Sequence, residues 1–309
     1  MSRQAARVLV ALAVVAAVAP WLAPYDPGRS FRDYLYAPPM APAVDMGGAY
    51  AHPLRLVDRL EQRYEADGDA RAPLPWFSAP GDAPVFLLGA DSFGRDVLSR
   101  LLQGARTSIG LGLVATLGSL LVGGLVGAWA GYRGGWVDEG LMRAADLLLV
   151  LPVIYVVLVL RAVLPLVLPP ATVFGLMAGI FVLVGWPIPA RGVRAIVRSE
   201  REREYVLAAR SLGAGTWRVL VRHLLPASRG YLVAQATLLL PAFVLAEATL
   251  SYVGLGFPGS VATWGTMLSE ASNLGALARF PWTLAPAAAI VAVVLTANLA
   301  VPRRLPGTR

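Results

Sequence analysis

The sequence predicts an all-α integral membrane protein with about six transmembrane helices, and three observations lead to this prediction. The 309-residue chain is 57% hydrophobic and only 15% charged, whereas a soluble domain carries roughly 25% charged residues. The apolar residues gather into runs long enough to cross a hydrocarbon core about 30 Å thick. The arginines gather between alternate runs, as the positive-inside rule expects. Because backbone groups in lipid must be hydrogen-bonded within their own segment, the runs are predicted to be helices.

The first apolar run covers residues 8–22 and follows Arg3 and Arg7. This arrangement resembles a signal peptide, and a small-x-small Ala-Val-Ala site stands directly before Pro20. The proline would hinder cleavage, and further apolar runs follow. We therefore predict that residues 1–23 form an uncleaved N-terminal transmembrane anchor.

Residues 24–105 are rich in Pro, Asp, Arg and Gly and contain no long apolar run. We predict an external (periplasmic) segment with a short helix around residues 54–64 and a more regular helix near residues 96–102. The segment is too polar and broken for an independent core, so it is expected to be an elaborated loop.

Five further apolar runs are predicted to form a helical core over residues 106–309. The first of them is rich in glycine, which lets helices pack closely. Two runs carry charges, Asp146 and Arg161 in one and Glu247 in another. The five runs cover residues 108–129, 144–167, 173–188, 231–255 and 282–301.

The short loops orient the spans through their arginines. With the N-terminus inside, the inner segments hold two arginines before the first span, then Arg133 and Arg143, then nine between residues 191 and 229, and three after the last span. The short outer loops hold only Arg279. We therefore predict that both termini are cytoplasmic.

The residue types also exclude several kinds of chemistry. There is no cysteine, and the only two histidines, His52 and His223, lie far apart in the sequence. Disulfides, thiolate metal sites and cysteine nucleophiles are excluded, and no metal site is expected. All 27 basic residues are arginine, so no lysine can complete a phosphate-binding Walker A loop. If the protein uses ATP, another chain must bind it.

The predicted cytoplasmic loop 191–229 holds nine arginines against three glutamates, a net charge of +6, and is expected to form two short amphipathic helices. The two apolar stripes are Tyr205, Ala208, Ala209 and Leu212, and then Trp217, Leu220, Val221 and Leu224. Gly213 is expected to stop the first helix, Thr216 to cap the second and Pro226 to end it. Small residues at such a bend would let a partner protein approach the backbone closely, and an amphipathic helix can lie in a partner's groove.

Three other interpretations of this loop stay open. A basic amphipathic helix can rest on anionic headgroups, and the loop could also be a solvated connector. Basic charge and a glycine-containing turn are compatible with a DNA-binding helix-turn-helix. However, about 38 residues tethered at both ends leave no third helix to complete a core, so nucleic acid is not expected as a partner.

The loop resembles the EAA loop of binding-protein-dependent ABC importer permeases. The pattern of that family is Glu-Ala-Ala, three residues, Gly, nine residues, Ile, one residue and Leu-Pro. The chain departs from the pattern at Leu207, where the family has Glu, and at His223, where it has Ile. It keeps in register Ala208, Ala209, Gly213, Leu225 and Pro226.

Other segments look like the dipeptide, oligopeptide and nickel branch of the same family. The similarity extends over most of residues 85–300, whereas residues 24–84 are longer than expected for the branch and have no explanation in the sequence. The resembling segments are residues 89–100 and 131–138, then Met142, Arg143 and Asp146, then residues 247–256, and Trp264 with Gly265.

The resemblance implies a type I ABC importer permease-like fold in the bacterial cytoplasmic membrane and a non-catalytic role in the import of peptides. The implied partners are a second homologous permease, two ABC ATPase subunits, an extracytoplasmic substrate-binding protein and membrane lipid. No cofactor is expected on this chain, because the partner ATPase would use ATP and Mg²⁺. The residues that the resemblance assigns to ATPase coupling are Tyr205, Ala208, Ala209, Arg210, Leu212, Gly213, Ala214, Gly215, Leu225 and Pro226.

Two charges within predicted spans invite a further hypothesis. Arg161 and Glu247 lie 17 and 16 residues into their spans from the same side of the membrane, so they would lie at similar depth. Charges in the membrane are costly and often functional, and these two could pair. Alternatively, Arg161 snorkels outward while Glu247 faces a wet cavity or the partner permease.

Other functions remain open at this point. On the same fold, the substrate could be nickel or another small solute. In a membrane anchor or assembly protein without transport activity, the bend motif would be a coincidence. A membrane-embedded enzyme is not favoured, because the chain lacks cysteine, has few histidines and shows no clustered cytoplasmic carboxylates.

Overall fold

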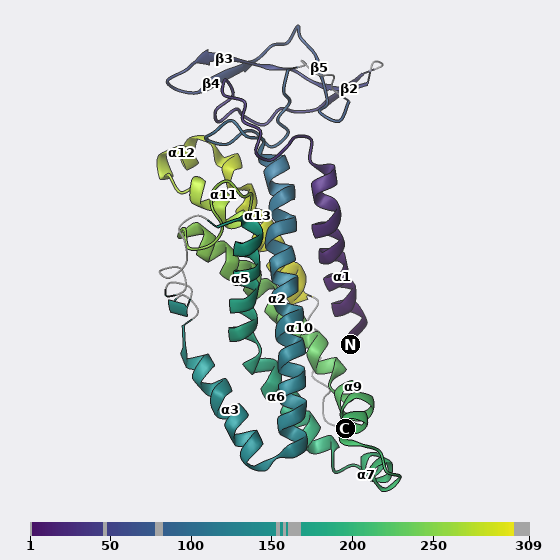
Figure 1. The fold of residues 1–309 in the computed structure, drawn as a ribbon. Coiled ribbons are helices and arrows are strands. Elements are labelled where there is room, and N and C mark those ends of the chain that lie inside the picture. Colours follow the sequence, from purple (N-terminus) through teal and green to yellow (C-terminus); the bar gives the residue numbers. More distant parts are fainter. Residues whose placement is uncertain are drawn as a thin grey trace. The chain divides into compact units, whose positions relative to one another are not determined.

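The computed structural model describes residues 2–45, 48–77, 83–152, 155, 156, 159 and 168–299. These residues are predominantly helical (Figure 1). They form two compact units, which are described separately below. Unit 1 comprises Met1–Ala13, Gly110–Glu247 and Val293–Arg309, and unit 2 comprises Val14–Ile109 and Ala248–Ala292.

Four helices contribute residues to both units: α1 (Ser2–Val18), α2 (Val97–Arg133), α10 (Arg229–Tyr252) and α13 (Ala285–Leu299). Unit 1 also contains α3 (Gly135–Val150), α5 (Pro170–Gly185), α6 (Pro187–Glu200), α7 (Glu204–Ser211), α8 (Thr216–Val219), the π-helical turn η2 (Leu220–Leu224) and α9 (Leu225–Ala227). Unit 2 also contains the 3-10 turns η1 (Ala19–Leu22) and η3 (Pro281–Leu284), with α11 (Trp264–Glu270) and α12 (Leu274–Arg279).

Several helices are long and apolar enough to cross a membrane. Among the described residues there are four, namely Gln4–Leu22, Val97–Arg133, Arg229–Tyr252 and Pro281–Leu299. A fifth span results if the bent pair α5 and α6 is counted as one. Half of the predicted span 144–167 lies outside the described residues, so the count of six remains a prediction.

Helix α2 joins two elements that the sequence analysis kept apart. The predicted helix near residues 96–102 and the predicted span 108–129 form one helix of 37 residues. No proline interrupts this stretch, so nothing in it breaks the helical hydrogen bonds. At 1.5 Å per residue the helix is about 55 Å long, and it therefore extends well beyond a hydrocarbon core about 30 Å thick.

The predicted span 173–188 ends earlier than expected. Helix α5 stops at Gly185, and α6 begins at Pro187 after a bend of 42° at Trp186. Proline is well placed at the first position of a helix, because its missing N–H has no partner there. The α6 helix then occupies the start of the loop 191–229, where no helix was predicted.

The predicted helix around residues 54–64 is wrong, because β3 (Leu54–Asp58) and β4 (Arg63–Ala66) pair there as an antiparallel hairpin. Exposure alternates along β3, and this period of two is typical of a strand. Asp58 Oδ1 accepts hydrogen bonds from the backbone N–H groups of Leu60 and Glu61, at 2.7 and 3.1 Å, which fixes the turn. A second sheet has the strand order β1-β2-β5, formed by β1 (Ala43–Asp45), β2 (Gly48–Ala51) and β5 (Ala72–Pro73).

The segment before α2 also has a hydrophobic core, contrary to the expectation of a coreless loop. Phe86 is fully buried, and its ring centroid lies 5.4 Å from that of Phe31 and 5.6 Å from that of Tyr34. Aromatic side chains bury much apolar area per residue, so a few of them organise this short, polar segment. The buried cluster consists of Ala37, Met40, Ala51, Ala72, Val85, Phe86 and Ala90.

Candidate functional site

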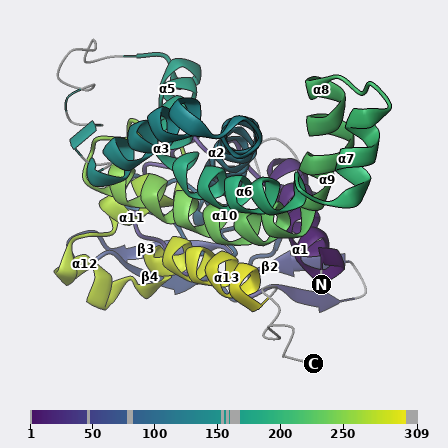
Figure 2. The ribbon, with the colours of Figure 1, turned by 90° about the horizontal axis from the view of Figure 1, so that it is seen from below.

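The candidate coupling site is a helical elbow in unit 1, formed by α7, α8, η2 and α9. These elements gather into one compact group (Figure 2). Val206 on α7 is fully buried and belongs to the same hydrophobic cluster as Val219, Leu220 and Leu224. The cluster also contains Ala128 of α2 with Val193 and Val197 of α6. Within unit 1, the elbow is therefore packed on α2 and α6.

Gly213 ends the first helix of the elbow, as predicted. Its φ angle is +84°, in the left-handed region that glycine adopts without strain. The Ala214 N–H donates to the Ala209 carbonyl at 3.0 Å, and this bond is the one that closes a Schellman motif. A Cβ built on Gly213 would meet nothing within 4 Å. The backbone conformation, rather than lack of space among the described residues, therefore favours glycine here.

The second half of the elbow differs from the prediction in two respects. The residue at the N-cap of α8 is Gly215 rather than Thr216, and no side chain caps this helix. Pro226 does not end the helical path, because α9 continues through it to Ala227. The preceding turn is π-helical, with the Leu225 N–H bonded to the Leu220 carbonyl. A wider turn of this kind adjusts the local hydrogen bonding ahead of a proline, which has no N–H to donate.

The apolar stripe predicted on α7 is not buried against the rest of unit 1. Tyr205 and Leu212 are 43% and 88% exposed, whereas the buried residue of α7 is Val206. In the second stripe, Leu220 and Leu224 are buried, but Trp217 is 66% exposed. The elbow therefore exposes several large apolar side chains, which together are called its outward apolar face: Tyr205, Leu207, Leu212, Trp217 and Val221.

Arginine side chains attach the elbow and α6 to the end of α2. Arg201 Nη1 donates to the carbonyls of Gly131 and Tyr132, at 3.1 and 3.2 Å. These carbonyls belong to the last turn of α2, which has no helical N–H left to bond them. The Arg210 guanidinium lies over the Tyr132 ring, 5.7 Å from its centroid. Arg194 forms a two-bond ion pair with the buried carboxylate of Asp138.

Glycines bring the backbones of α2 and α6 into contact. A Cβ on Gly131 would lie 2.6 Å from the Arg194 carbonyl oxygen, and one on Gly127 would overlap the Ala190 carbonyl. Such distances allow no side chain. The contacts explain why the segment 131–138 carries Gly131 and Asp138, since both hold α6.

The predicted pair of Arg161 with Glu247 cannot be placed on this structure, because Arg161 lies outside the described residues. Glu247 is fully buried in α10. The pairing therefore stays a prediction.

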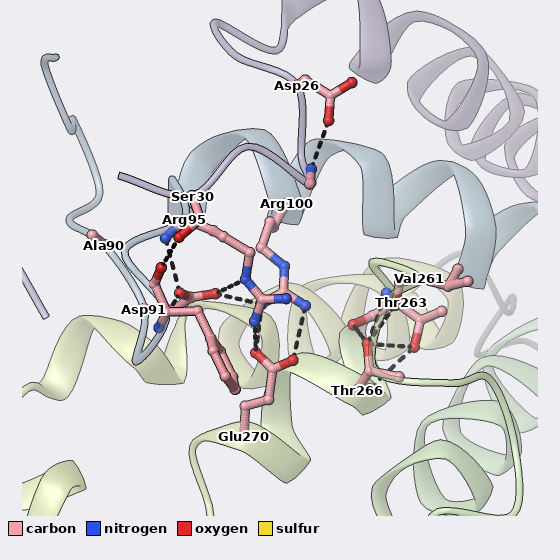
Figure 3. Close-up of polar contacts among 12 residues, drawn as sticks. Asp26, Ser30, Ala90, Asp91, Arg95, Arg100, Val261, Thr263, Thr266 and Glu270 are labelled. Carbon is pink, nitrogen blue, oxygen red and sulfur yellow. Dashed lines mark hydrogen bonds and ion pairs between the residues drawn. The ribbon is translucent and has the colours of Figure 1, made fainter. Parts of the chain in front are cut away.

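A charge cluster in unit 2 was missed by the sequence analysis, although its residues lie in the segment 89–100. The side chains of Arg95 and Arg100 converge on Glu270 of α11, beside Asp91 (Figure 3). Arg95 donates to Asp91 at 2.8 Å and to Glu270 at 2.7 Å. Arg100, only 1% exposed, pairs with both carboxylates. Two guanidiniums and two carboxylates thus balance one another. Only the arginine spacing was visible in the sequence, since Glu270 lies 170 residues from Arg100.

Asp96 lies next to this cluster and begins α2. Its Oδ2 accepts hydrogen bonds from the backbone N–H and the hydroxyl of Ser99, at 2.8 and 2.6 Å, as an N-cap does. Its Oδ1 is buried without a hydrogen-bond partner among the described residues. Burial raises the pKa of Asp96 to about 6, although the bonds from Ser99 act in the opposite direction.

Trp264 and Gly265 have structural roles in the same unit. The Trp264 indole N–H donates to the Leu101 carbonyl at 3.1 Å, and its backbone N–H donates to the Ser108 hydroxyl at 3.2 Å. A Cβ on Gly265 would lie 2.6 Å from the Ala248 carbonyl oxygen. The two residues thus join α11 to α2 and α10 within unit 2.

Multiple apolar helices and a charged helical elbow define this chain as a multi-pass membrane protein. The family of binding-protein-dependent transport system inner membrane components matches residues 123–303. The chain belongs to this family and is a multi-pass protein of the inner membrane, which confirms the resemblance found in the sequence.

Curated relatives place the similarity in the peptide branch of the family. The oligopeptide transport system permease OppC of Bacillus subtilis is 40% identical over 202 residues, which cover 63% of this chain and 62% of that protein. The di/tripeptide transport system permease DppC of Pseudomonas aeruginosa is 34% identical over 282 residues, which cover 91% of this chain and 78% of the relative. The dipeptide permease DppC of Alkalihalophilus pseudofirmus is 36% identical over 220 residues, which cover 71% of this chain and 70% of that protein. The aligned part thus spans less than two thirds of the length of the B. subtilis protein and more than two thirds of the length of the other two relatives.

Proposed function

We propose that this chain is a transmembrane permease subunit of an ATP-driven, binding-protein-dependent importer of peptides. The names of its relatives, which refer to oligopeptide, di/tripeptide and dipeptide transport, support the substrate class. The chain itself would form part of the transport pathway and transmit conformational changes, and it would not catalyse a chemical reaction. Six spans and cytoplasmic termini, as the arginine distribution predicts, are part of this proposal.

The observation that carries the proposal is the outward apolar face of the elbow. Leu212 is 88% exposed and Trp217 is 66% exposed, in a loop with a net charge of +6. Large apolar side chains grouped on a charged surface are typical of a docking site. A short amphipathic helix whose apolar face points outward fits a hydrophobic groove of a partner, and we assign that groove to the ATPase.

The attachment of the elbow indicates how movement would pass to the membrane. Val206 packs in the cluster that contains residues of α2 and α6, and Arg201 bonds the end of α2. Because packed interfaces of this kind move as units, a displacement of α7 would shift α6 and α2 with it. ATP binding and hydrolysis in the partner would then bias the permease between two global states.

The proposed partners are a second homologous permease, two ABC ATPase subunits and an extracytoplasmic binding protein. The chain has no lysine for a Walker A loop, so ATP and Mg²⁺ are assigned to the ATPase and no cofactor to this chain. Gly213, Ala214 and Gly215 would lie at the contact, because a Cβ on either glycine meets no non-neighbouring atom within 4 Å among the described residues.

Uptake of labelled substrates in cells that lack the chromosomal copy tests the proposal. We expect the intact chain to restore uptake of a labelled dipeptide, tripeptide or pentapeptide, and a Leu212→Asp variant at equal membrane level to restore much less. Uptake of radioactive Ni²⁺ serves as the parallel arm. Restoration of nickel uptake without any peptide uptake would replace the peptide assignment, and restoration of neither by the intact chain would favour the anchor or assembly interpretation.

A further inference from the structure

Two pairs of exposed apolar residues are brought together where the first candidate span ends. Trp21 and Leu22 are the last residues of the span Gln4–Leu22 and are 84% and 55% exposed. Trp76 and Phe77 follow strand β5 and are 47% and 73% exposed. The Trp76 indole N–H donates to the Leu22 carbonyl at 3.1 Å. This bond brings together two pairs of residues that lie 54 positions apart, and we call the four residues the aromatic patch.

A second candidate span also contacts the segment between α1 and α2. Trp282 lies at the start of the candidate span Pro281–Leu299, and its indole N–H donates to the Ala90 carbonyl at 3.0 Å. The Phe280 ring stacks on that of Tyr36, with centroids 4.2 Å apart. The hydrogen bond and the ring stack both connect the segment between α1 and α2 to residues at the start of this span. The segment is therefore held close to the surface of the bilayer.

The composition of the aromatic patch fits the interfacial layer of a membrane. Tryptophan is enriched there, because its ring is apolar while its N–H needs a hydrogen-bond acceptor. Trp76 has such an acceptor in the Leu22 carbonyl and leaves its ring half exposed. Facing water, four adjacent apolar side chains of this size would form a patch that soluble surfaces rarely expose unless it has a binding role.

We propose that the aromatic patch inserts into the headgroup and glycerol layer of the bilayer and anchors the two-sheet segment to the membrane surface. The occupant of the patch is phospholipid, because the patch continues directly from the end of a span. The β3–β4 turn provides the contrast. Leu60 in this turn is 95% exposed, and in unit 2 the hairpin lies beyond the ends of the helices (Figure 1). Leu60 should therefore remain in water.

The absence of cysteine from the sequence makes the test direct. Single cysteines replace exposed apolar residues in the variants Phe77→Cys and Leu60→Cys, and each receives a nitroxide spin label. The labelled chain is isolated with its native partners and placed in phospholipid nanodiscs. Collisions of the label with oxygen, which concentrates in the apolar layer, are compared with collisions with a water-soluble nickel chelate. Unchanged thermal unfolding shows that neither label disturbs the fold.

We expect oxygen to collide more often than the chelate at position 77 and less often at position 60. More frequent collisions with the chelate at both positions would place the aromatic patch in water and overturn the proposal. Low collision rates with both reagents at position 77 would show that another protein covers the patch, which also overturns it.

Discussion

Arg100 Nη2 lies 3.1 Å from Oε1 of Glu270, a residue 170 positions further along the chain. The contact joins the first turns of α2 to the end of α11 inside unit 2. Asp91 and Arg95 complete the cluster, so that each charge faces an opposite one. A buried ion pair is weak evidence for net stabilisation, but it makes the loss of one partner costly.

Replacement of Arg100 by methionine should destabilise the protein strongly. Methionine keeps most of the apolar stem but leaves the carboxylates of Asp91 and Glu270 without their main cation, at a cost of about 3–5 kcal/mol. Thermal unfolding of the detergent-solubilised protein measures this cost. The control is Arg63→Met, because Arg63 pairs with Glu65 on an exposed surface, where a pair contributes about 0–1 kcal/mol. Equal shifts for the two variants would contradict the role of the cluster.

Asp96 should make stability depend on pH in the acid range. Its pKa in the folded protein is raised to about 6 by burial, whereas the unfolded value is about 3.9. Between these values the folded state binds more protons than the unfolded state, so this group lowers the free energy of unfolding as pH rises from about 4 to about 6. Above about pH 7 its contribution is constant.

The variant Asp96→Asn isolates the contribution of the Asp96 carboxyl to the pH dependence of stability. Its amide oxygen can still accept the Ser99 N–H, but the side chain does not titrate. Relative to the variant, the parent protein should lose stability between about pH 4 and 6. If the free energies of unfolding of the parent and the variant change in parallel between these pH values, the pKa of the Asp96 carboxyl is not raised.

Two adjacent glycines of α2 should respond in opposite directions to the same substitution. A Cβ on Gly123 would lie 2.6 Å from the Trp186 carbonyl oxygen, whereas one on Gly124 would meet nothing within 4 Å. Gly123→Ala should therefore cost about 1–3 kcal/mol through overpacking, while Gly124→Ala should stabilise the helix by about 0.5–1 kcal/mol. Thermal unfolding of the two variants side by side measures the difference, and stabilisation by both would contradict the close approach of the two chain segments.

The elbow should depend on the backbone freedom of Gly213. Valine at φ +84° costs about 1–2 kcal/mol, whereas asparagine tolerates the left-handed region. Amide hydrogen exchange across α7 and α8 should accelerate about 5- to 30-fold in Gly213→Val and much less in Gly213→Asn. Gly215→Ala is the matched control, because Gly215 has φ −66° and open space for a Cβ. Equal acceleration in all three variants would contradict the conformational argument.

The membrane class and the elbow could be predicted from the sequence, because long apolar runs and the spacing from Ala208 to Pro226 are local signals. The sequence left open which side of α7 this chain covers, because Tyr205, Ala208 and Leu212 form a helical stripe whether the stripe is covered by this chain or by another. Val206 is the buried residue that fixes the orientation, and its cluster combines the neighbouring elements α6, α8 and η2 with Ala128 of the distant helix α2.

Long-range contacts explain the other differences. The aromatic rings around Phe86 come from positions up to about 60 residues apart, so no local sequence pattern predicted this core. The hairpin of β3 and β4 was not predicted. Leu54 and Leu56 lie on one face of a strand, but the stretch is too short to distinguish the strand period of two from the helical period of 3.6. The partner of Arg100 could not be chosen among many acidic residues without the fold.

The central claim is that the exposed face of the elbow binds an ATPase, and co-purification tests it most directly. The intact complex is extracted in mild detergent from cells that express the chain or its Leu212→Asp variant. The matched control is Leu60→Asp, since Leu60 is equally apolar and 95% exposed in unit 2. We predict that the ATPase co-purifies with the parent chain and with Leu60→Asp, and that its yield falls about tenfold or more with Leu212→Asp, which corresponds to about 1.4 kcal/mol. An undiminished yield of ATPase with Leu212→Asp would contradict the account.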